Sequence, residues 1–79
     1  MTESHGSIAT VKSHRKLEDD GSDALGVAAW LLADVHEYGN RIFGKTGWRL
    51  IDMRFTREMI ADGKKSVLYL SVTARLEPK

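Results

Sequence analysis

The sequence predicts a small α+β domain in which one helix covers a three-stranded sheet. Residues 23–38 carry apolar side chains at helical spacing, residues 48–60 and 66–77 alternate as the strands of a hairpin, and residues 7–17 alternate as a further strand. For the order strand, helix, strand, strand, the last strand most simply lies between the other two, antiparallel to both. The predicted sheet order is therefore 1-3-2, with the helix on the apolar face.

The chain length sets the domain organisation. Its 79 residues allow one domain, and 42% hydrophobic and 29% charged residues are ordinary for a soluble globular protein. A chain of this size buries only about 60% of its unfolded surface, so self-association is expected. We expect residues 1–6 to be disordered and residues 7–79 to form the single domain.

The expected compartment follows from what the sequence lacks. There is no cysteine, which gives no basis for disulfides or a thiolate metal site. The longest apolar run, residues 24–33, is too short to cross a bilayer, and the polar N-terminus has no signal-peptide core. We therefore expect a cytoplasmic protein that does not bind membranes.

Charge is unevenly distributed. Residues 1–40 contain three Lys or Arg against seven Asp or Glu, a net −4, and residues 41–79 contain nine against four, a net +5. This pattern fits either a solvated surface with a charge dipole or a basic face for an acidic partner.

The helix is predicted to run from about Asp23 to Tyr38, with Ser22 as N-cap and Gly39-Asn40 as the stop signal. Trp30 projects away from the predicted core-facing stripe, which makes it a candidate contact for a partner. The stripe consists of Leu25, Ala28, Leu32, Val35 and Gly39, bordered by Leu31 and Tyr38.

The hairpin is predicted from its turn. Asp62-Gly63 favours a two-residue type I′ turn, because that turn needs positive φ at both positions. Centring the turn there places Phe55 opposite Leu70, and apolar residues then meet along one face. The other face is predicted to be polar with interspersed aromatic residues, and it comprises Trp48, Leu50, Asp52, Arg54, Thr56, Val67, Tyr69, Ser71, Thr73 and Arg75.

Residues 39–46, GNRIFGKT, match the phosphate-loop pattern G-x-x-x-x-G-K-[ST]. A phosphate loop follows a strand and opens a helix, whereas here a predicted helix precedes the match and a strand follows it. The segment is therefore interpreted as a helix-to-strand connection, and nucleotide hydrolysis is not expected. Arg41 and Lys45 remain candidates for binding an anion, and Lys64 and Lys65 are further candidates at the hairpin tip.

No spacing of titratable residues indicates catalysis. His5, His14 and His36 are scattered without metal-ligand spacing, and no nucleophile–base arrangement is supported. The sequence predicts a protein that is not an enzyme and has no metal or cofactor.

Two segments carry a resemblance to known proteins. GWRLI at residues 47–51 and LYLSVTARLEP at residues 68–78 resemble a family of small uncharacterised bacterial and phage-encoded domains with a Gly-Trp-x-Leu strand. That resemblance implies a fold and no activity. The strand order also resembles that of dodecins, flavin-binding dodecamers with a Trp on the second strand, which implies an aromatic ligand at Trp48.

Three functions remain open. The first is an interaction domain that binds itself or another protein through its exposed sheet face and the Trp30 side of the helix. The second is a nucleic-acid-binding module, with aromatic side chains stacking on bases and arginines contacting phosphates. The third is a binder of a flavin-like aromatic ligand at Trp48. The candidate contact residues are Trp30, Trp48, Leu50, Arg54, Tyr69 and Arg75.

Overall fold

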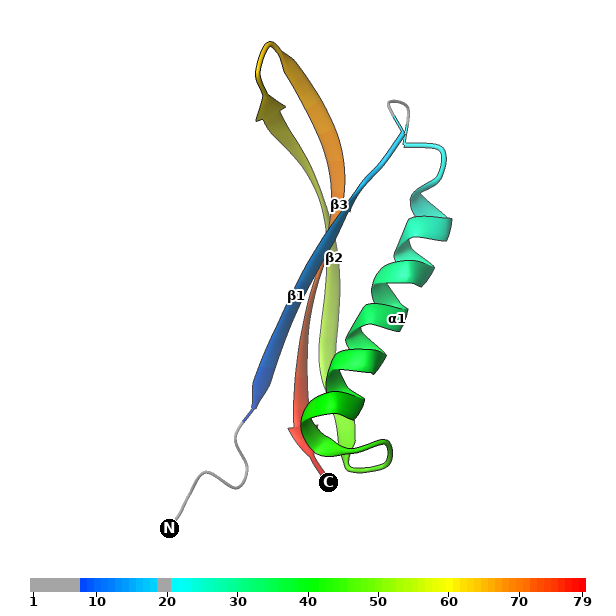
Figure 1. Ribbon diagram of the computed structural model, residues 1–79, viewed down its shortest axis with the longest axis vertical. Coiled ribbons are helices and arrows are strands. Elements are labelled where there is room, and N and C mark those ends of the chain that lie inside the picture. Colours follow the sequence, from blue (N-terminus) through cyan, green and yellow to red (C-terminus); the bar gives the residue numbers. More distant parts are fainter. Residues whose placement is uncertain (1–7, 19–20) are drawn as a thin grey trace.

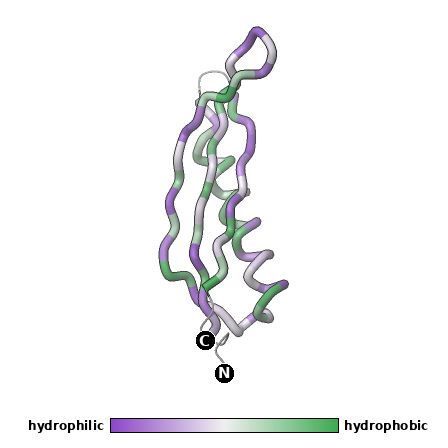
Figure 2. Tube along the Cα trace, turned by 90° about the vertical axis from the view of Figure 1, so that its left-hand side faces the viewer, coloured by the Kyte–Doolittle hydropathy of each residue, from purple (hydrophilic) through white to green (hydrophobic). Residues whose placement is uncertain are grey.

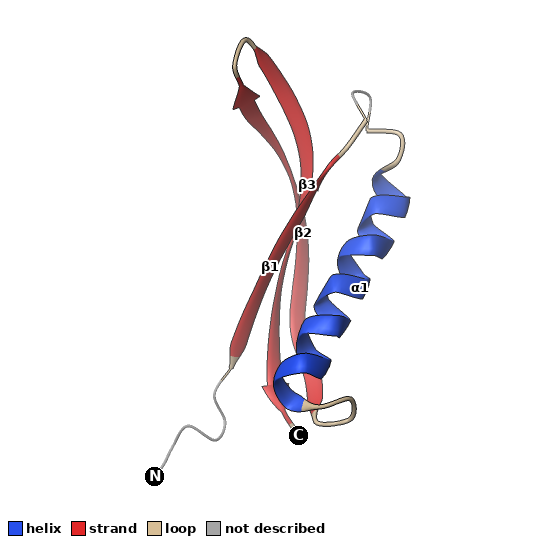
Figure 3. Cartoon of the chain, viewed as in Figure 1, coloured by secondary structure: helices blue, strands red, loops and turns tan. Residues whose placement is uncertain are grey.

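The computed structural model describes residues 8–18 and 21–79. In chain order they form strand β1 (Ala9–Lys16), helix α1 (Ala24–Phe43), strand β2 (Trp48–Asp62) and strand β3 (Lys65–Pro78). The three strands form one sheet, and α1 lies along one face of it (Figures 1 and 3). The predicted disorder of residues 1–6 concerns residues outside the described ranges.

The sheet has the order β1-β3-β2, with β3 antiparallel to both neighbours. The predicted α+β class and strand order are confirmed, and β1 is an edge strand as expected. Hydrophobic and hydrophilic residues alternate along the strands (Figure 2), because successive side chains of a strand point to opposite faces. One face is therefore apolar and lies toward α1, and the other is polar and uncovered.

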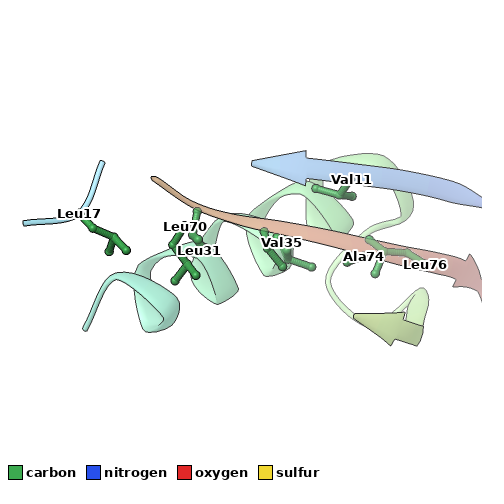
Figure 4. Close-up of a cluster of buried hydrophobic side chains, with 8 residues drawn as sticks. Val11, Leu17, Leu31, Val35, Leu70, Ala74 and Leu76 are labelled. Atoms are coloured by element: carbon green, nitrogen blue, oxygen red, sulfur yellow. The ribbon is translucent and has the colours of Figure 1, made fainter. Parts of the chain in front are cut away.

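The core is small and lies between α1 and β3, with β1 at its edge (Figure 4). Every second residue of β3 from Leu70 to Leu76 is buried, because β3 is the central strand and α1 covers one of its faces. The buried apolar side chains of the described residues are Val11, Leu17, Leu31, Val35, Leu70, Val72, Ala74 and Leu76.

Helix α1 is longer than predicted and is rotated relative to the predicted stripe. It continues through Gly39 to Phe43, and the chain leaves it at Gly44, which takes φ +86°. The buried helical residues are Leu31, Val35 and Gly39, whereas Leu25 is 89% exposed. The predicted end at Tyr38 was therefore wrong, because Gly39 is a packing position and Gly44 supplies the terminating conformation.

The hairpin register differs from the prediction by two residues. Asp62 pairs with Lys65, so the turn is Gly63-Lys64, and Phe55 lies opposite Val72. Gly63 takes φ +66° and Lys64 does not take positive φ, which is the pattern of a type II′ turn. This turn avoids the positive φ that a turn centred on Asp62-Gly63 would impose on Asp62. A shift by two residues keeps every side chain on its predicted face.

A β-bulge at Ile51 reverses the facing of the start of β2. Asp52 pairs with Arg75, but Leu50 pairs with Leu76. Three residues of β2 (50–52) therefore lie opposite two residues of β3 (75–76), and Ile51 is the extra residue. Leu76 is buried under α1, so Leu50 lies on the helix side of the sheet, while Asp52 lies on the uncovered side. The bulge thus moves Leu50 and Trp48 to the face opposite the predicted one.

Candidate binding surfaces

A hollow between α1 and β2 beside Trp48 continues along the helix side of β2 as an exposed apolar surface. Helix α1 packs chiefly against β3 and β1, which leaves the helix side of β2 partly uncovered. Three apolar side chains of β2 are exposed there: Leu50 at 43%, Phe55 at 38% and Met59 at 63%. From α1, Leu32 is 38% exposed, and Leu25 lies two turns earlier on the same flank. We call this surface the α1–β2 groove.

Trp48 forms the end of the groove near the C-terminus of α1. Its indole ring lies against Gly39, and its Nε1–H donates a hydrogen bond of 2.9 Å to Asn40 Oδ1. The His36 ring meets the indole at 75°, with 5.2 Å between ring centroids. Three partners from one helix therefore fix the orientation of Trp48.

A pocket of about 440 Å³ opens beside the Trp48 ring. It combines an apolar floor with an amide, an imidazole and a lysine at its edge. Such a mixture suits a flat aromatic ligand with an anionic substituent. The pocket is lined by Leu32, Val35, His36, Asn40, Lys45, Trp48 and Leu50.

The predicted anion-binding residues are not brought together. Arg41 pairs with Glu37 at 3.2 Å on the exposed side of α1, and Lys45 lies at the Trp48 pocket. Lys64 and Lys65 lie at the hairpin tip, at the other end of the molecule (Figure 1). The GNRIFGKT segment comprises the last helical turns and a loop into β2, so the strand-before, helix-after arrangement of a phosphate loop is missing here.

The uncovered face of the sheet, which we call the open sheet face, holds Arg54, Tyr69 and Arg75 as predicted. Arg75 Nε donates to both carboxylate oxygens of Asp52 at 3.0 Å, and its Nη2 also contacts that carboxylate. Hydrogen bonding from Arg75 holds the pKa of Asp52 below its ordinary value and raises the pKa of Arg75. Arg75 is therefore occupied within the chain, and Arg54 is the more available cation.

Strand β1 adds basic residues to the open sheet face that were not among the predicted site residues. Lys12, His14 and Lys16 alternate with the core-facing residues of β1 and so project from the uncovered side. The His14 and Tyr69 rings meet edge to face, with centroids 5.4 Å apart. The alternation of residues 7–17 contained this signal, but identifying it required knowing which face of that strand is buried.

Trp30 lies on the flank of α1 nearest β1. It is 63% exposed, and the Arg15 guanidinium carbon is 5.3 Å from its ring centroid. Arg15 also pairs with Asp34 at 3.4 Å, and Ser13 Oγ donates to the same carboxylate at 3.2 Å. The prediction that Trp30 lies outside the core stripe is confirmed, but its ring already has a partner within the chain.

The described ranges contain neither a metal-binding cluster nor a membrane-spanning helix. Residues 8–18 and 21–79 contain no cluster of three or more side chains with metal-binding chemistry. No helix in the same ranges is long and apolar enough to span a bilayer. Comparisons with protein-family models, curated proteins and solved structures give no match.

Proposed function

We propose that this protein is a non-enzymatic interaction domain that assembles with further copies of itself through the α1–β2 groove. The observation that carries the proposal is the set of exposed apolar side chains on the helix side of β2, interrupted by Arg57, next to a core of few residues. Fully burying one such side chain contributes about 1.5–3 kcal/mol, and those of the groove are still about half exposed. Covering the groove therefore adds substantially to the stability of a marginal core.

The length of the hairpin supports the same proposal. Strand β2 has 15 residues and α1 has 20, which correspond to about 50 Å and about 30 Å. Tyr69 is the last residue of β3 toward the tip that pairs with β1, so the end of the hairpin has two strands only. A two-stranded ribbon is at best marginally stable by itself.

The groove continues to the tip of the hairpin at Met59, which is 63% exposed, and Ile60 on the opposite face of the tip is 42% exposed. In one chain, the apolar side chains of the groove are not covered by another element, and the two-stranded end of the hairpin does not pack against one. A second copy supplies a complement to both, which favours self-association over a partner that matches only one of them.

The experiment is a mass measurement by light scattering on the wild-type chain and two variants. Met59→Asp places a charge in the groove, whereas Thr56→Asp places the same charge on the open sheet face of the same strand. We expect the wild type and Thr56→Asp to be oligomeric and Met59→Asp to shift to the monomer. A monomeric wild type, or an oligomer that Met59→Asp leaves intact, would contradict the proposal.

A second candidate function rests on the Trp48 pocket. Its Trp ring is fixed before a ligand arrives, which reduces the ordering cost of binding, and Lys45 offers a cation at the edge. We propose a flat aromatic ligand of flavin-like chemistry at this site. Flavin mononucleotide should quench Trp48 fluorescence in a Trp30→Phe background, and Lys45→Ala should weaken its binding. Fluorescence that does not change with added flavin would exclude this candidate.

A further inference from the structure

The open sheet face carries cations that the described contacts leave without a carboxylate partner. Of the acidic side chains on this face, Asp52 is held by Arg75, Glu77 is paired with Arg49 at 2.8 Å, and Glu58 accepts a 2.6 Å hydrogen bond from Ser71. No described ion pair involves Lys12, Lys16 or Arg54. Glu58 keeps its negative charge opposite Tyr69, in the same row as Lys16, so the uncompensated positive charge beside Thr73 is carried by Lys12 and Arg54.

Two of these cations flank one hydroxyl group. Thr73 of the central strand pairs with Lys12 on one side and with Arg54 on the other. Adjacent strands lie about 4.8 Å apart, so the backbones of Lys12 and Arg54 are about 10 Å apart. Both side chains are long enough to contact one anion placed between them. A shallow depression of about 360 Å³ lies on the β2 side of Thr73, and it is lined by Asp52, Met53, Arg54, Thr73 and Arg75.

An aromatic surface adjoins this group. Tyr69, Ser71 and Thr73 lie in this order along β3, on the same face of the sheet. His14 pairs with Ser71. Residues two apart on a strand are separated by about 7 Å, so His14 lies about that far from the row of Lys12 and Thr73. His14 and Tyr69 form one edge-to-face pair, in which His14 is exposed and Tyr69 is half-buried, and it offers a π surface beside the cations.

We propose that the open sheet face binds a nucleotide unit, with its phosphate between Lys12 and Arg54 above Thr73 and its base against the His14–Tyr69 pair. The guanidinium fork of Arg54 and the ammonium of Lys12 match the charge and geometry of a phosphate. The His14 end of the aromatic pair starts about 7 Å from the cation row and the Tyr69 end about 14 Å, a range that covers the reach from phosphate to base within one nucleotide. This site is on the opposite face of the sheet from the α1–β2 groove, so it is independent of the proposed self-association.

The experiment is a titration of backbone amide resonances with adenosine monophosphate, inorganic phosphate and a single-stranded oligonucleotide of about 8 nucleotides. We expect adenosine monophosphate to shift the resonances of Thr73, Ser71 and Tyr69 and to bind more tightly than inorganic phosphate. Tighter binding of the oligonucleotide, weakening as salt rises, would identify a strand as the source of the nucleotide. Binding of the monophosphate alone would identify a free nucleotide.

Variants locate the site. Lys12→Ala and Arg54→Ala should each weaken binding by about tenfold, since each removes one charge-assisted contact. Arg57→Ala is the matched control, because it removes the same charge from the helix side of the same strand. The proposal is overturned if the monophosphate shifts none of the resonances on this face, if Arg57→Ala weakens binding as much as Arg54→Ala, or if inorganic phosphate binds as tightly as the monophosphate.

Discussion

The Trp48 indole lies so close to the backbone of Gly39 that a Cβ atom at position 39 would be 2.5 Å from Trp48 Cε2. Gly39 is the first residue of the segment that matches a phosphate loop, and Gly44 is its second glycine. The first admits the indole ring against the helix, and the second ends the helix at φ +86°. Both glycines of the match thus have structural roles that involve no phosphate.

Gly39→Ala should destabilise the protein. The new methyl group overlaps the Trp48 ring, and overpacking of this kind costs about 1–3 kcal/mol, which outweighs the helix propensity that alanine adds. Gly26→Ala is the control within the same helix, since no atom lies within 4 Å of the position its Cβ would take. It should stabilise the protein by about 0.5–1 kcal/mol. Urea unfolding measures both, and equal stabilisation by the two variants would refute the Trp48–Gly39 contact.

The pKa of Asp52 should depend on Arg75 more than on Arg54. Arg75 lowers the Asp52 pKa by direct hydrogen bonding, while Arg54 acts only through its charge. We expect Arg75→Gln to return this pKa toward 3.8 and Arg54→Gln to raise it less. Carbon NMR titration of the Asp52 carboxyl group measures the shift, and the opposite order of the two variants would contradict the contact.

The same pair should give a small acid-dependent contribution to stability. Because the folded pKa of Asp52 lies below the ordinary value of 3.8, the contribution is present above that pH and is lost as pH falls through the folded pKa. Both side chains are exposed, so the effect is limited by solvent screening. Comparing acid unfolding of the wild type and Arg75→Gln checks this: their stabilities should converge at low pH and differ near neutral pH.

The two tryptophans should differ in their access to solvent. Trp30 is 63% exposed, whereas Trp48 is half-buried against α1 and lies at the end of the proposed interface. In acrylamide quenching, Trp48→Phe, which retains Trp30, should be quenched more strongly than Trp30→Phe, which retains Trp48. Equal quenching would place Trp48 in solvent and contradict its packing on Gly39.

Much of the fold could be predicted because the strand alternation and the helical period agree with the tertiary structure. The face of the sheet on which each side chain from Asp52 to Arg75 lies was predicted correctly. The strand pairing was wrong by two residues, but a shift by two residues leaves each side chain on the same face. The bulge at Ile51 could not be predicted, because nothing in the pattern around it distinguishes an extra residue from continued alternation. Its consequence was large: Trp48 and Leu50 were assigned to the wrong face.

The helix shows a second limit of the sequence pattern. A glycine followed by asparagine ordinarily indicates a helix end, and only the tertiary contact with Trp48 explains why Gly39 stays helical. The predicted stripe placed Leu25 and Leu32 in the core, whereas one chain leaves both exposed along the groove. Apolar periodicity reports all the apolar surface a helix carries, and it does not distinguish surface buried within one chain from surface available to a second copy.

The solution mass of the wild-type chain tests the proposed self-association most directly. Sedimentation equilibrium over a range of protein concentrations should give a mass of at least twice that of the 8.8 kDa chain at the higher concentrations. A mass of 8.8 kDa at every concentration, from a folded chain, would show that the α1–β2 groove does not bind a second copy.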